Sequence, residues 1–172
     1  MTTKRINFVQ KYYAYAKAVQ EKTGFPISSI LAQCAIETGD GATIVGNMMF
    51  GVKDTDGVNG NEQLLCTQEQ STNGNLKYQY LLKKVKSGNI YTYYIKAYFR
   101  KYATPEESFF DHANFILTNR RYSKALQYKN QPTYFSREIA RAGYATGVDY
   151  ERIFISITYE IYNWLQSNNY EQ

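Results

Sequence analysis

Apolar residues recur every three or four positions along the first 40 residues, which predicts two helices there. Residues 5–23 carry the stripe of an amphipathic helix, and the glycine that follows is expected to end it. A second helix is expected to begin with Ser28 or Ser29 as its N-terminal cap and to continue to about Glu37. Two glycines shortly after Glu37 end this second helix.

The second half of the chain shows the same helical period. Thr104, followed by Pro105 and then Glu107, has the form of a capping box, which marks the start of a helix. Asp149 is expected to cap the last helix. The helices predicted in this half span about residues 104–117, 132–142 and 149–166, with a short helical piece near 122–126.

Between residues 62 and 100 the pattern changes to one typical of strands, rich in Tyr, Thr and Ile. Asn73-Gly74 predicts a hairpin turn that joins the first two strands. The lysine-rich stretch 83–89 is expected to be a turn between the second and third. The predicted strands span about residues 64–68, 76–82 and 90–99. The chain is therefore predicted to be α+β, a mostly helical body with a small antiparallel β lobe over about residues 62–100.

Length and composition limit the remaining choices. With 172 residues, 44% of them hydrophobic, the chain is expected to form one domain over residues 1–172. The net charge of +5 suits an anionic partner, but no phosphate loop, zinc-finger spacing or RNA-binding signature is present, so nucleic acid is not expected. Cys34 and Cys66 make no disulfide framework, and His112 alone cannot build a His-rich metal site. We expect no metal and no cofactor.

Two further features of the sequence concern export and the binding of sugars. The stretch 1–7 lacks the apolar core of a secretory signal, and no apolar run approaches membrane-spanning length. The 18 tyrosines are consistent with stacking on sugar rings, although most of them are expected to be ordinary core or surface residues.

Four stretches of the sequence resemble one enzyme family. Residues 32–41 read AQCAIETGDG and residues 47–53 read NMMFGVK, which are similar to the AQAAxETGWG and NLFGIK runs of the glucosaminidase family of bacterial cell-wall hydrolases, glycoside hydrolase family seventy-three. Residues 99–113 resemble the family's FRxY and ESFxDHA run, and residues 142–146 read AGYAT, as in the family. The resemblance implies a lysozyme-like fold. It also implies endo-acting cleavage of the β-1,4 bond that follows N-acetylglucosamine in peptidoglycan glycan strands.

Glu37 is the predicted general acid. It lies at the C-terminal end of an apolar helix, where the helix dipole and apolar neighbours should make a carboxyl harder to ionise. A group of that kind can donate a proton near neutral pH. A glycosidase also needs a second group. We assign that role to Glu69, which resembles a T-x-E run on the first strand of the family's β hairpin and precedes the predicted hairpin turn, with Glu62 as the substitute candidate.

The resemblance implies further site residues. Tyr144 is expected to line the cleft, where its phenol could bond the acetamido group of the sugar or stabilise the transition state. Asn47, Phe50 and Asp111 are the predicted substrate-binding residues, with Asp111 at the floor of the cleft. Asp111 and His112 are also expected to tie their helix to the β lobe through hydrogen bonds.

Asp40 departs from the family pattern, because the family usually has tryptophan there. An aspartate brings a second negative charge near Glu37, which would raise the pKa of Glu37 if the two approach closely, and activity could be reduced. A noncatalytic wall-binding or virion structural protein is therefore one alternative, and a muramidase or lytic transglycosylase on the same fold is another. A cysteine peptidase using Cys34 and His112 is disfavoured, since Cys34 falls in mid-helix on the apolar face.

The expected partner is the peptidoglycan glycan strand, bound by a monomer without insertion into a membrane. The route to the wall is left open. A phage lysis or tail enzyme, an effector delivered by other machinery and a piece of a longer secreted protein all fit. The stereochemical route is open as well, since water activated by Glu69 and participation of the substrate's own acetamido group both suit this pattern.

Overall fold

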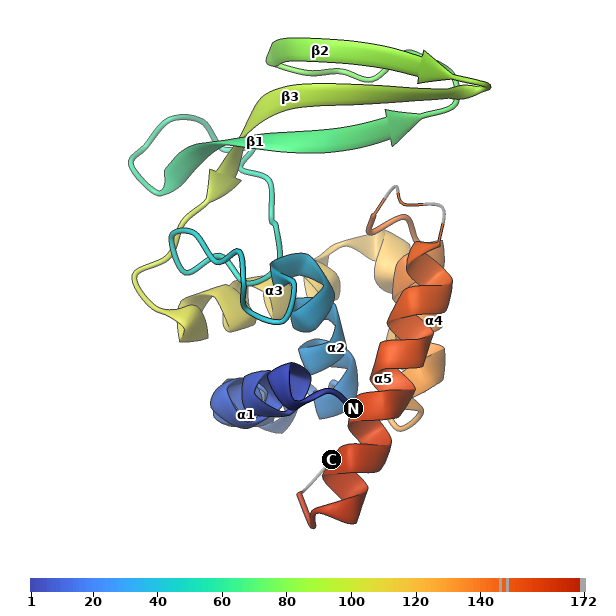
Figure 1. The fold of residues 1–172 in the computed structure, drawn as a ribbon. Helices are drawn as coiled ribbons and strands as arrows, with labels where there is room; N and C mark the ends of the chain where they lie inside the picture. The colour runs from blue at the N-terminus through green and yellow to red at the C-terminus, as the bar shows by residue number, and fades with distance from the viewer. Residues whose placement is uncertain (146, 148, 171–172) are drawn as a thin grey trace.

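The computed structural model describes residues 1–145, 147 and 149–170. They form a body of helices below a small antiparallel sheet (Figure 1), so the predicted α+β class is confirmed. The helices are α1 (Thr3–Thr23), α2 (Ile27–Thr38), α3 (Pro105–Thr118), α4 (Pro132–Arg141) and α5 (Tyr150–Ser167), with two 3-10 turns, η1 (Arg120–Tyr122) and η2 (Ala125–Tyr128). The strands are β1 (Glu62–Ser71), β2 (Tyr80–Ser87) and β3 (Ile90–Arg100).

Helix α2 is the centre of the body. It packs against α1, α4 and α5, and ten of its twelve residues are buried, so it has no solvent-facing stripe. Gly39 ends it in the left-handed conformation, with its N–H bonded to the carbonyls of Ala35 and Ile36. Because the helix ends here, Glu37 lies in its last turn and at the edge of the core.

Two of the predicted helix starts are confirmed in position but differ in how they are capped. Thr104 accepts a hydrogen bond from the N–H of Glu107 (3.2 Å), as a capping box predicts. Asp149 precedes α5, but its carboxylate accepts a bond from Arg152 Nε (3.3 Å) and makes no cap to the backbone.

The serine cap predicted for α2 is wrong. The helix begins directly after Pro26 without a side-chain cap. The Ser29 hydroxyl instead donates to the carbonyl of Pro132 (2.9 Å), which ties α2 to the start of α4. The Ser29 hydroxyl is therefore used in a contact between two helices and does not cap α2.

The sheet order is β1-β3-β2, so the hairpin predicted at Asn73-Gly74 is wrong. Strands β1 and β2 each pair antiparallel with β3 and therefore run in the same direction, and residues 72–79 return along the sheet between them. The Tyr93 hydroxyl donates to the carbonyl of Gly74, and the Tyr78 and Tyr93 rings lie 5.9 Å apart, so this return segment lies against the sheet. The tight turn joins β2 and β3 at residues 88 and 89.

The lysine-rich stretch predicted as a turn lies largely within β2. Every residue of this strand is exposed, and it forms an edge of the sheet. Lysines suit such a position, because charged side chains discourage an edge strand from pairing with another chain. The lysines therefore mark an edge strand and not a break in the strand.

The sheet is joined to the body through the segment after Phe50. Val52 accepts a backbone bond from Arg100 (3.0 Å), Asp54 donates one to Tyr98 (3.0 Å), and Lys53 pairs with Phe99. The buried residues of β3 are not part of the large apolar cluster formed by the helices and residues 49–52. The lobe is therefore attached by hydrogen bonds along one edge of the body.

Candidate active site

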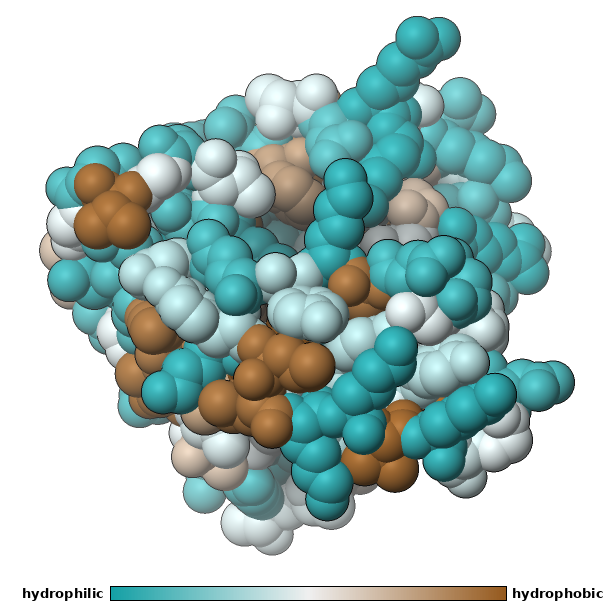
Figure 2. Space-filling model, turned by 90° about the horizontal axis from the view of Figure 1, so that it is seen from above, coloured by the Kyte–Doolittle hydropathy of each residue, from teal (hydrophilic) through white to brown (hydrophobic). Residues whose placement is uncertain are grey.

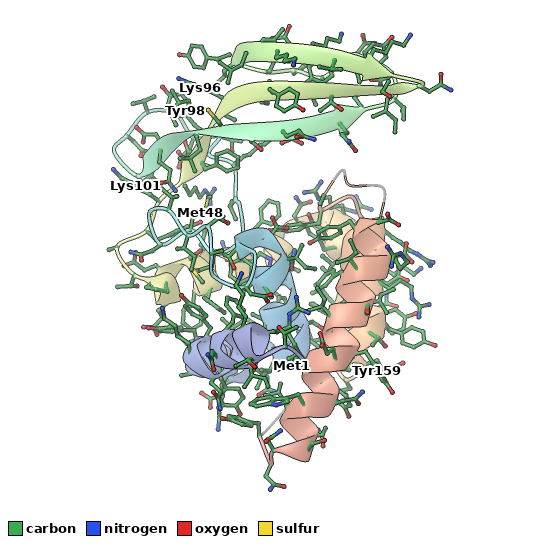
Figure 3. The ribbon with its side chains drawn as sticks, viewed as in Figure 1. Met1, Met48, Lys96, Tyr98, Lys101 and Tyr159 are labelled. Atoms are coloured by element: carbon green, nitrogen blue, oxygen red, sulfur yellow. The ribbon has the colours of Figure 1, made fainter. Side chains whose placement is uncertain are left out.

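A cleft of about 1060 Å³ lies between the helical body and the sheet. Six consecutive residues of β1, Leu65–Gln70, line it, which means that the free edge of this strand faces the body. Met48, labelled below the sheet in Figure 3, lines it from the body side, while Lys96 and Tyr98 are labelled on the lobe above. The end of α2, residues 50–53 and the segment around Tyr144 complete the walls.

Glu37 projects into this cleft from the last turn of α2. Its Oε1 accepts a hydrogen bond from the Tyr150 hydroxyl (3.3 Å). Its Oε2 lies so close to Gly51, whose φ is +60°, that a Cβ added there would meet this oxygen at 3.4 Å. Glycine at position 51 therefore lets the backbone pass close beside the carboxyl.

The burial of Glu37 sets its protonation state. The pKa of this carboxyl is raised from 4.5 to about 7, chiefly by desolvation and further by the charge of Glu69, while the hydrogen bond from Tyr150 acts in the opposite direction. Near neutral pH the group is present in both forms. Such a carboxyl can give a proton to a leaving group and exist as the carboxylate afterwards.

Glu69 lines the same cleft from β1, where it lies opposite Tyr93 in the register. Its side chain is 15% exposed, and its Oε1 lies 2.7 Å from Lys53 Nζ. The structure thus places the two predicted carboxyl residues in one cleft, Glu37 on the body and Glu69 on the sheet, as a pair of groups flanking a sugar chain would require.

Tyr144 lies next to Tyr150 in the wall of the cleft. The two rings are nearly parallel, with centroids 6.3 Å apart and 14° between their planes. The Tyr144 hydroxyl donates to the carbonyl of Phe50 (2.7 Å), and burial raises the pKa of the phenol well above its usual range. Tyr144 is therefore a neutral phenol whose oxygen can still accept a bond. Thr146, the last residue of the AGYAT run, lies outside the described residues.

Residues 13–163 match the model of the glucosaminidase family, described as mannosyl-glycoprotein endo-beta-N-acetylglucosaminidase. The chain belongs to this family. The resemblance seen in the sequence is thereby confirmed.

Related proteins agree with the family assignment. The peptidoglycan hydrolase FlgJ of Vibrio cholerae is 33% identical over 152 residues, covering 85% of this chain and 40% of that protein. FlgJ of Pseudomonas aeruginosa is 30% identical, with 84% and 34% covered. The chain thus spans less than half the length of these relatives.

Solved structures confirm the lysozyme-like glycoside hydrolase fold. A mutant peptidoglycan hydrolase from Sphingomonas sp. A1 superposes with a TM-score of 0.73 at 22% identity, covering 94% of this chain and 98% of that one. A truncated glycoside hydrolase domain of FlgJ from Salmonella typhimurium gives a TM-score of 0.66 at 26% identity, with 91% and 97% covered.

Two of the predicted substrate-binding residues of this member of the glucosaminidase family are not among the described residues that line the cleft. The Asn47 amide donates to the carbonyls of Tyr102 (3.0 Å) and Ala103 (2.9 Å). Asp111 accepts bonds from Arg100 (2.7 Å) and from the Tyr102 hydroxyl (2.7 Å). Both side chains are used to hold the segment between β3 and α3. Of the three predicted substrate-binding residues, Phe50 is the one that lines the cleft among the described residues.

His112 packs but does not form the predicted hydrogen bonds to the lobe. Its ring stacks on Phe50 (3.9 Å between centroids, 9° between planes), and among the described residues Nε2 has no partner. Burial lowers the pKa of the imidazole to about 3, so the ring is neutral. Cys34 lies fully within the core, where burial raises the pKa of the thiol well above its usual range. This environment is unlike that of a reactive thiolate, and it disfavours a cysteine peptidase.

Two further acidic residues considered in the sequence, Glu62 and Asp40, are not among the described residues that line the cleft. Glu62, the substitute for Glu69, accepts bonds from the N–H groups of Asn59 (3.0 Å) and Gly60 (2.8 Å) and closes a surface turn. Asp40 is held by Arg5, whose Nε lies 2.9 Å from Oδ1. The charge that raises the pKa of Glu37 comes from Glu69 and not from Asp40, so the rise in pKa expected from this departure from the family is absent.

Two residues at the cleft were missed in the sequence. Tyr150 bonds directly to Glu37, and Arg121 lines the wall beside Tyr144. Tyr150 is the first residue of α5, six positions after Tyr144, so the start of that helix was the available signal. The pattern around Arg121 carried no such signal, because its role depends on contacts between η1 and a distant loop.

The described residues contain no group of three or more His, Cys, Asp or Glu side chains arranged to hold a metal ion. Across residues 1–145, 147 and 149–170, no helix has the length and apolar character needed to cross a membrane.

Proposed function

We propose that this glucosaminidase hydrolyses the β-1,4 bond that follows N-acetylglucosamine, within the glycan strands of bacterial peptidoglycan. The observation that carries the proposal is the state of Glu37, a carboxyl with a pKa of about 7 in a cleft that it shares with Glu69. The relatives named as peptidoglycan hydrolases support the choice of substrate. We further propose that a single chain, folded as one domain, acts at the cell wall.

In this proposal Glu37 gives its proton to the glycosidic oxygen as the bond to the anomeric carbon breaks. The electron pair of that bond leaves with the oxygen, and positive charge develops on the sugar ring. The Tyr150 hydroxyl then donates to the carboxylate that Glu37 has become, which stabilises the charged product of proton transfer.

Glu69 acts from the opposite side of the cleft. Its carboxylate either takes the proton of an attacking water or stabilises the positive charge while the neighbouring acetamido oxygen attacks the anomeric carbon. In the second route, water later opens the resulting ring and returns a proton to the Glu37 carboxylate. The Tyr144 oxygen is suited to accept a bond from the acetamido N–H, because its own proton is used by Phe50.

The test is the chemistry of the cut ends. Purified sacculi are digested, and the fragments are reduced with borohydride and analysed by mass spectrometry. Reduced N-acetylglucosamine ends are expected. Reduced N-acetylmuramic acid would show a muramidase, and an anhydro sugar would show a lytic transglycosylase. Sacculi that bind the protein but release no sugar would favour a noncatalytic wall protein.

The matched control is Glu37→Gln, which keeps the size of the side chain and removes the acid. Its rate should fall by roughly 10²–10⁴-fold, the usual contribution of a general acid, while its circular dichroism stays that of the parent chain. A Glu37→Gln chain that clears sacculi at the parent rate would remove Glu37 from this role.

A further inference from the structure

Three cationic residues line the cleft, and they differ in whether a carboxylate of the protein is bound to them. Lys53 lies 2.7 Å from Glu69, and Arg100 lies 2.7 Å from Asp111. Arg121 is exposed and forms no ion pair within the described part of the chain. Its positive charge is therefore available to bind a negatively charged group from outside the protein.

The Arg121 guanidinium is nevertheless held in place. It lies over the Tyr122 ring at 4.6 Å and over the Phe115 ring at 5.6 Å from the centroids. One nitrogen, Nη1, is 3.5 Å from the carbonyl of Gly143, and this is a long and weak bond. Contact with two rings holds the group in place, while most of its five N–H donors stay unused.

A row of tyrosine rings connects Arg121 to the reacting centre. Tyr150 bonds to Glu37, the Tyr144 ring lies 6.3 Å from Tyr150, and the Tyr122 ring lies 6.3 Å from Tyr144. The Arg121 guanidinium lies over Tyr122, the ring at the far end of this row. A sugar chain lying along the wall of the cleft would thus meet the acid and the guanidinium on the same side.

We propose that Arg121 forms a subsite for a carboxylate carried by the substrate. The inference rests on the proposed function, because peptidoglycan is a glycan with carboxylates along its length. Two sources share this chemistry, namely the lactyl group of a muramyl sugar without its peptide and the peptide attached to that group. The planar fork of the guanidinium suits a two-point bond to either carboxylate, which a lysine could not make.

The experiment measures binding in the Glu37→Gln background, so that the strands remain intact. Calorimetry is run with stem-free glycan strands, with stem-bearing strands, and with each strand after its carboxyls have been converted to amides. Arg121→Gln is compared with Arg120→Gln, a matched control in the same 3-10 turn that is not among the described residues lining the cleft. Melting temperatures verify that both variants fold.

Arg121→Gln should raise the Kd for carboxylated strands by about tenfold, the effect of losing one charge-assisted contact, and leave the Kd for amidated strands unchanged. Arg121→Lys should recover only part of the loss, and Arg120→Gln should bind like the parent. A loss limited to stem-bearing strands identifies the peptide as the source, and a loss limited to stem-free strands identifies the lactyl group.

Equal losses on carboxylated and amidated strands would overturn the proposal, since they would show that Arg121 only supports the loop of Gly143. No loss on any strand would overturn it as well. Hydrolysis of sacculi by the parent chain is scored separately. If the parent releases no sugar while the carboxylate-dependent loss persists, the proposed function fails and the subsite stands.

Discussion

At the scale of single residues, the site depends on opposing effects on one carboxyl. Burial and the charge of Glu69 favour the protonated form of Glu37, while the Tyr150 hydrogen bond favours the charged form. A fully exposed glutamate would be ionised at neutral pH, and a buried one without a donor would hold its proton too firmly to give it to the leaving oxygen. The hydroxyl of Tyr150 keeps the pKa of Glu37 near neutral pH, as the proposed role of general acid requires.

Tyr150→Phe removes that hydroxyl and keeps the ring that packs on Tyr144. The pKa of Glu37 should rise by about half a unit to one unit, since a bond that favours the carboxylate is lost. The alkaline limb of the kcat/KM profile, which reports the proton on the acid, should therefore move to higher pH. A kcat/KM profile measured on sacculi from pH 5 to 9 covers the alkaline limb.

The control is Tyr159→Phe, on the same helix but 60% exposed and labelled on the outer side of α5 in Figure 3. Its profile should coincide with that of the parent. An unchanged alkaline limb in Tyr150→Phe, or a shift of equal size in the control, would contradict the role given to Tyr150.

The same carboxyl makes stability depend on pH. Its pKa is about 7 in the folded chain and near 4.5 for a solvated glutamate in the unfolded chain, so the folded state holds more protons between these values. The free energy of unfolding should therefore fall as pH rises through this range, by up to about 3 kcal/mol from this one group. The free energy of unfolding of Glu37→Gln should not show this fall, because the variant has no carboxyl at position 37.

Urea unfolding at pH 4.5 and at pH 8 measures this effect. The variant should gain stability relative to the parent on going from the lower to the higher pH, because the parent alone then buries a charge. Other titrating groups are common to both chains and cancel in the difference. If the free energies of unfolding of the variant and the parent differ by the same amount at both pH values, Glu37 titrates normally in the folded chain.

At the scale of elements, Arg5 of α1 joins three helices. Its guanidinium bonds to Asp40 after α2 (2.9 Å) and to Glu160 of α5 (2.7 Å). The side chains of Arg5 and Asp40 are only 19% and 14% exposed, so this network is shielded more than a surface ion pair. The aspartate that departs from the family sequence thus has a structural partner in α1.

Asp40→Asn should lower the free energy of unfolding by about 1–2 kcal/mol, because Arg5 keeps its charge with one carboxylate fewer. The rate on sacculi should stay that of the parent, since Asp40 is not among the described residues that line the cleft. Urea denaturation and a turbidity assay measure the two quantities. A large loss of rate without loss of stability would mean that Asp40 acts on the site after all.

How far the elements follow from the sequence differs between the body and the lobe. Gly24, Gly39 and Thr104 lie at helix ends where local chemistry dictates a stop or a cap, and the predicted boundaries there agree with the structure. Asn73-Gly74 also carries a local turn signal, and Gly74 has φ +70°. A turn signal does not say which strands pair, because β3 enters the sheet from later in the chain and separates β1 from β2.

The same distinction applies to the site. Glu37 could be found from its place at a helix end, and Glu69 from a short match on a strand. Arg121 could not be found, because its exposure and lack of an ion partner among the described residues depend on where η1, the Gly143 loop and the sheet meet in space. Asn47 is predicted from the sequence to bind substrate, because no pattern there indicates that its amide donates to the backbone carbonyl of Tyr102.

At the scale of the whole molecule, charge is distributed unevenly. Residues 62–100 contain six lysines and arginines but only two acidic residues, so the lobe accounts for most of the net charge of +5. Figure 2 looks down on this end of the molecule and shows hydrophilic side chains projecting around separate apolar ones. The exposed apolar side chains of the lobe include Leu64, Tyr80, Leu82 and Tyr94.

A cationic lobe over the cleft should speed encounter with an anionic wall. The rate on sacculi at low substrate should therefore fall by about tenfold as salt rises from about 0.02 to 0.3 M, because the Debye length shortens to less than the width of the lobe. Lys83→Gln with Lys96→Gln should lower the rate at low salt and flatten this dependence. Both side chains are exposed, and neither is among the described residues lining the cleft, so kcat at saturation should stay that of the parent.

Sacculi whose carboxyls have been converted to amides provide the comparison. On these the parent and the double variant should show the same weak dependence on salt, since the attraction needs charge on both partners. A steep dependence that persists on amidated sacculi would place the effect of salt in the protein alone. The lobe would then contribute the free edge of β1 and Glu69 to the cleft, and its lysines would serve only to keep the exposed strand β2 from pairing with another chain.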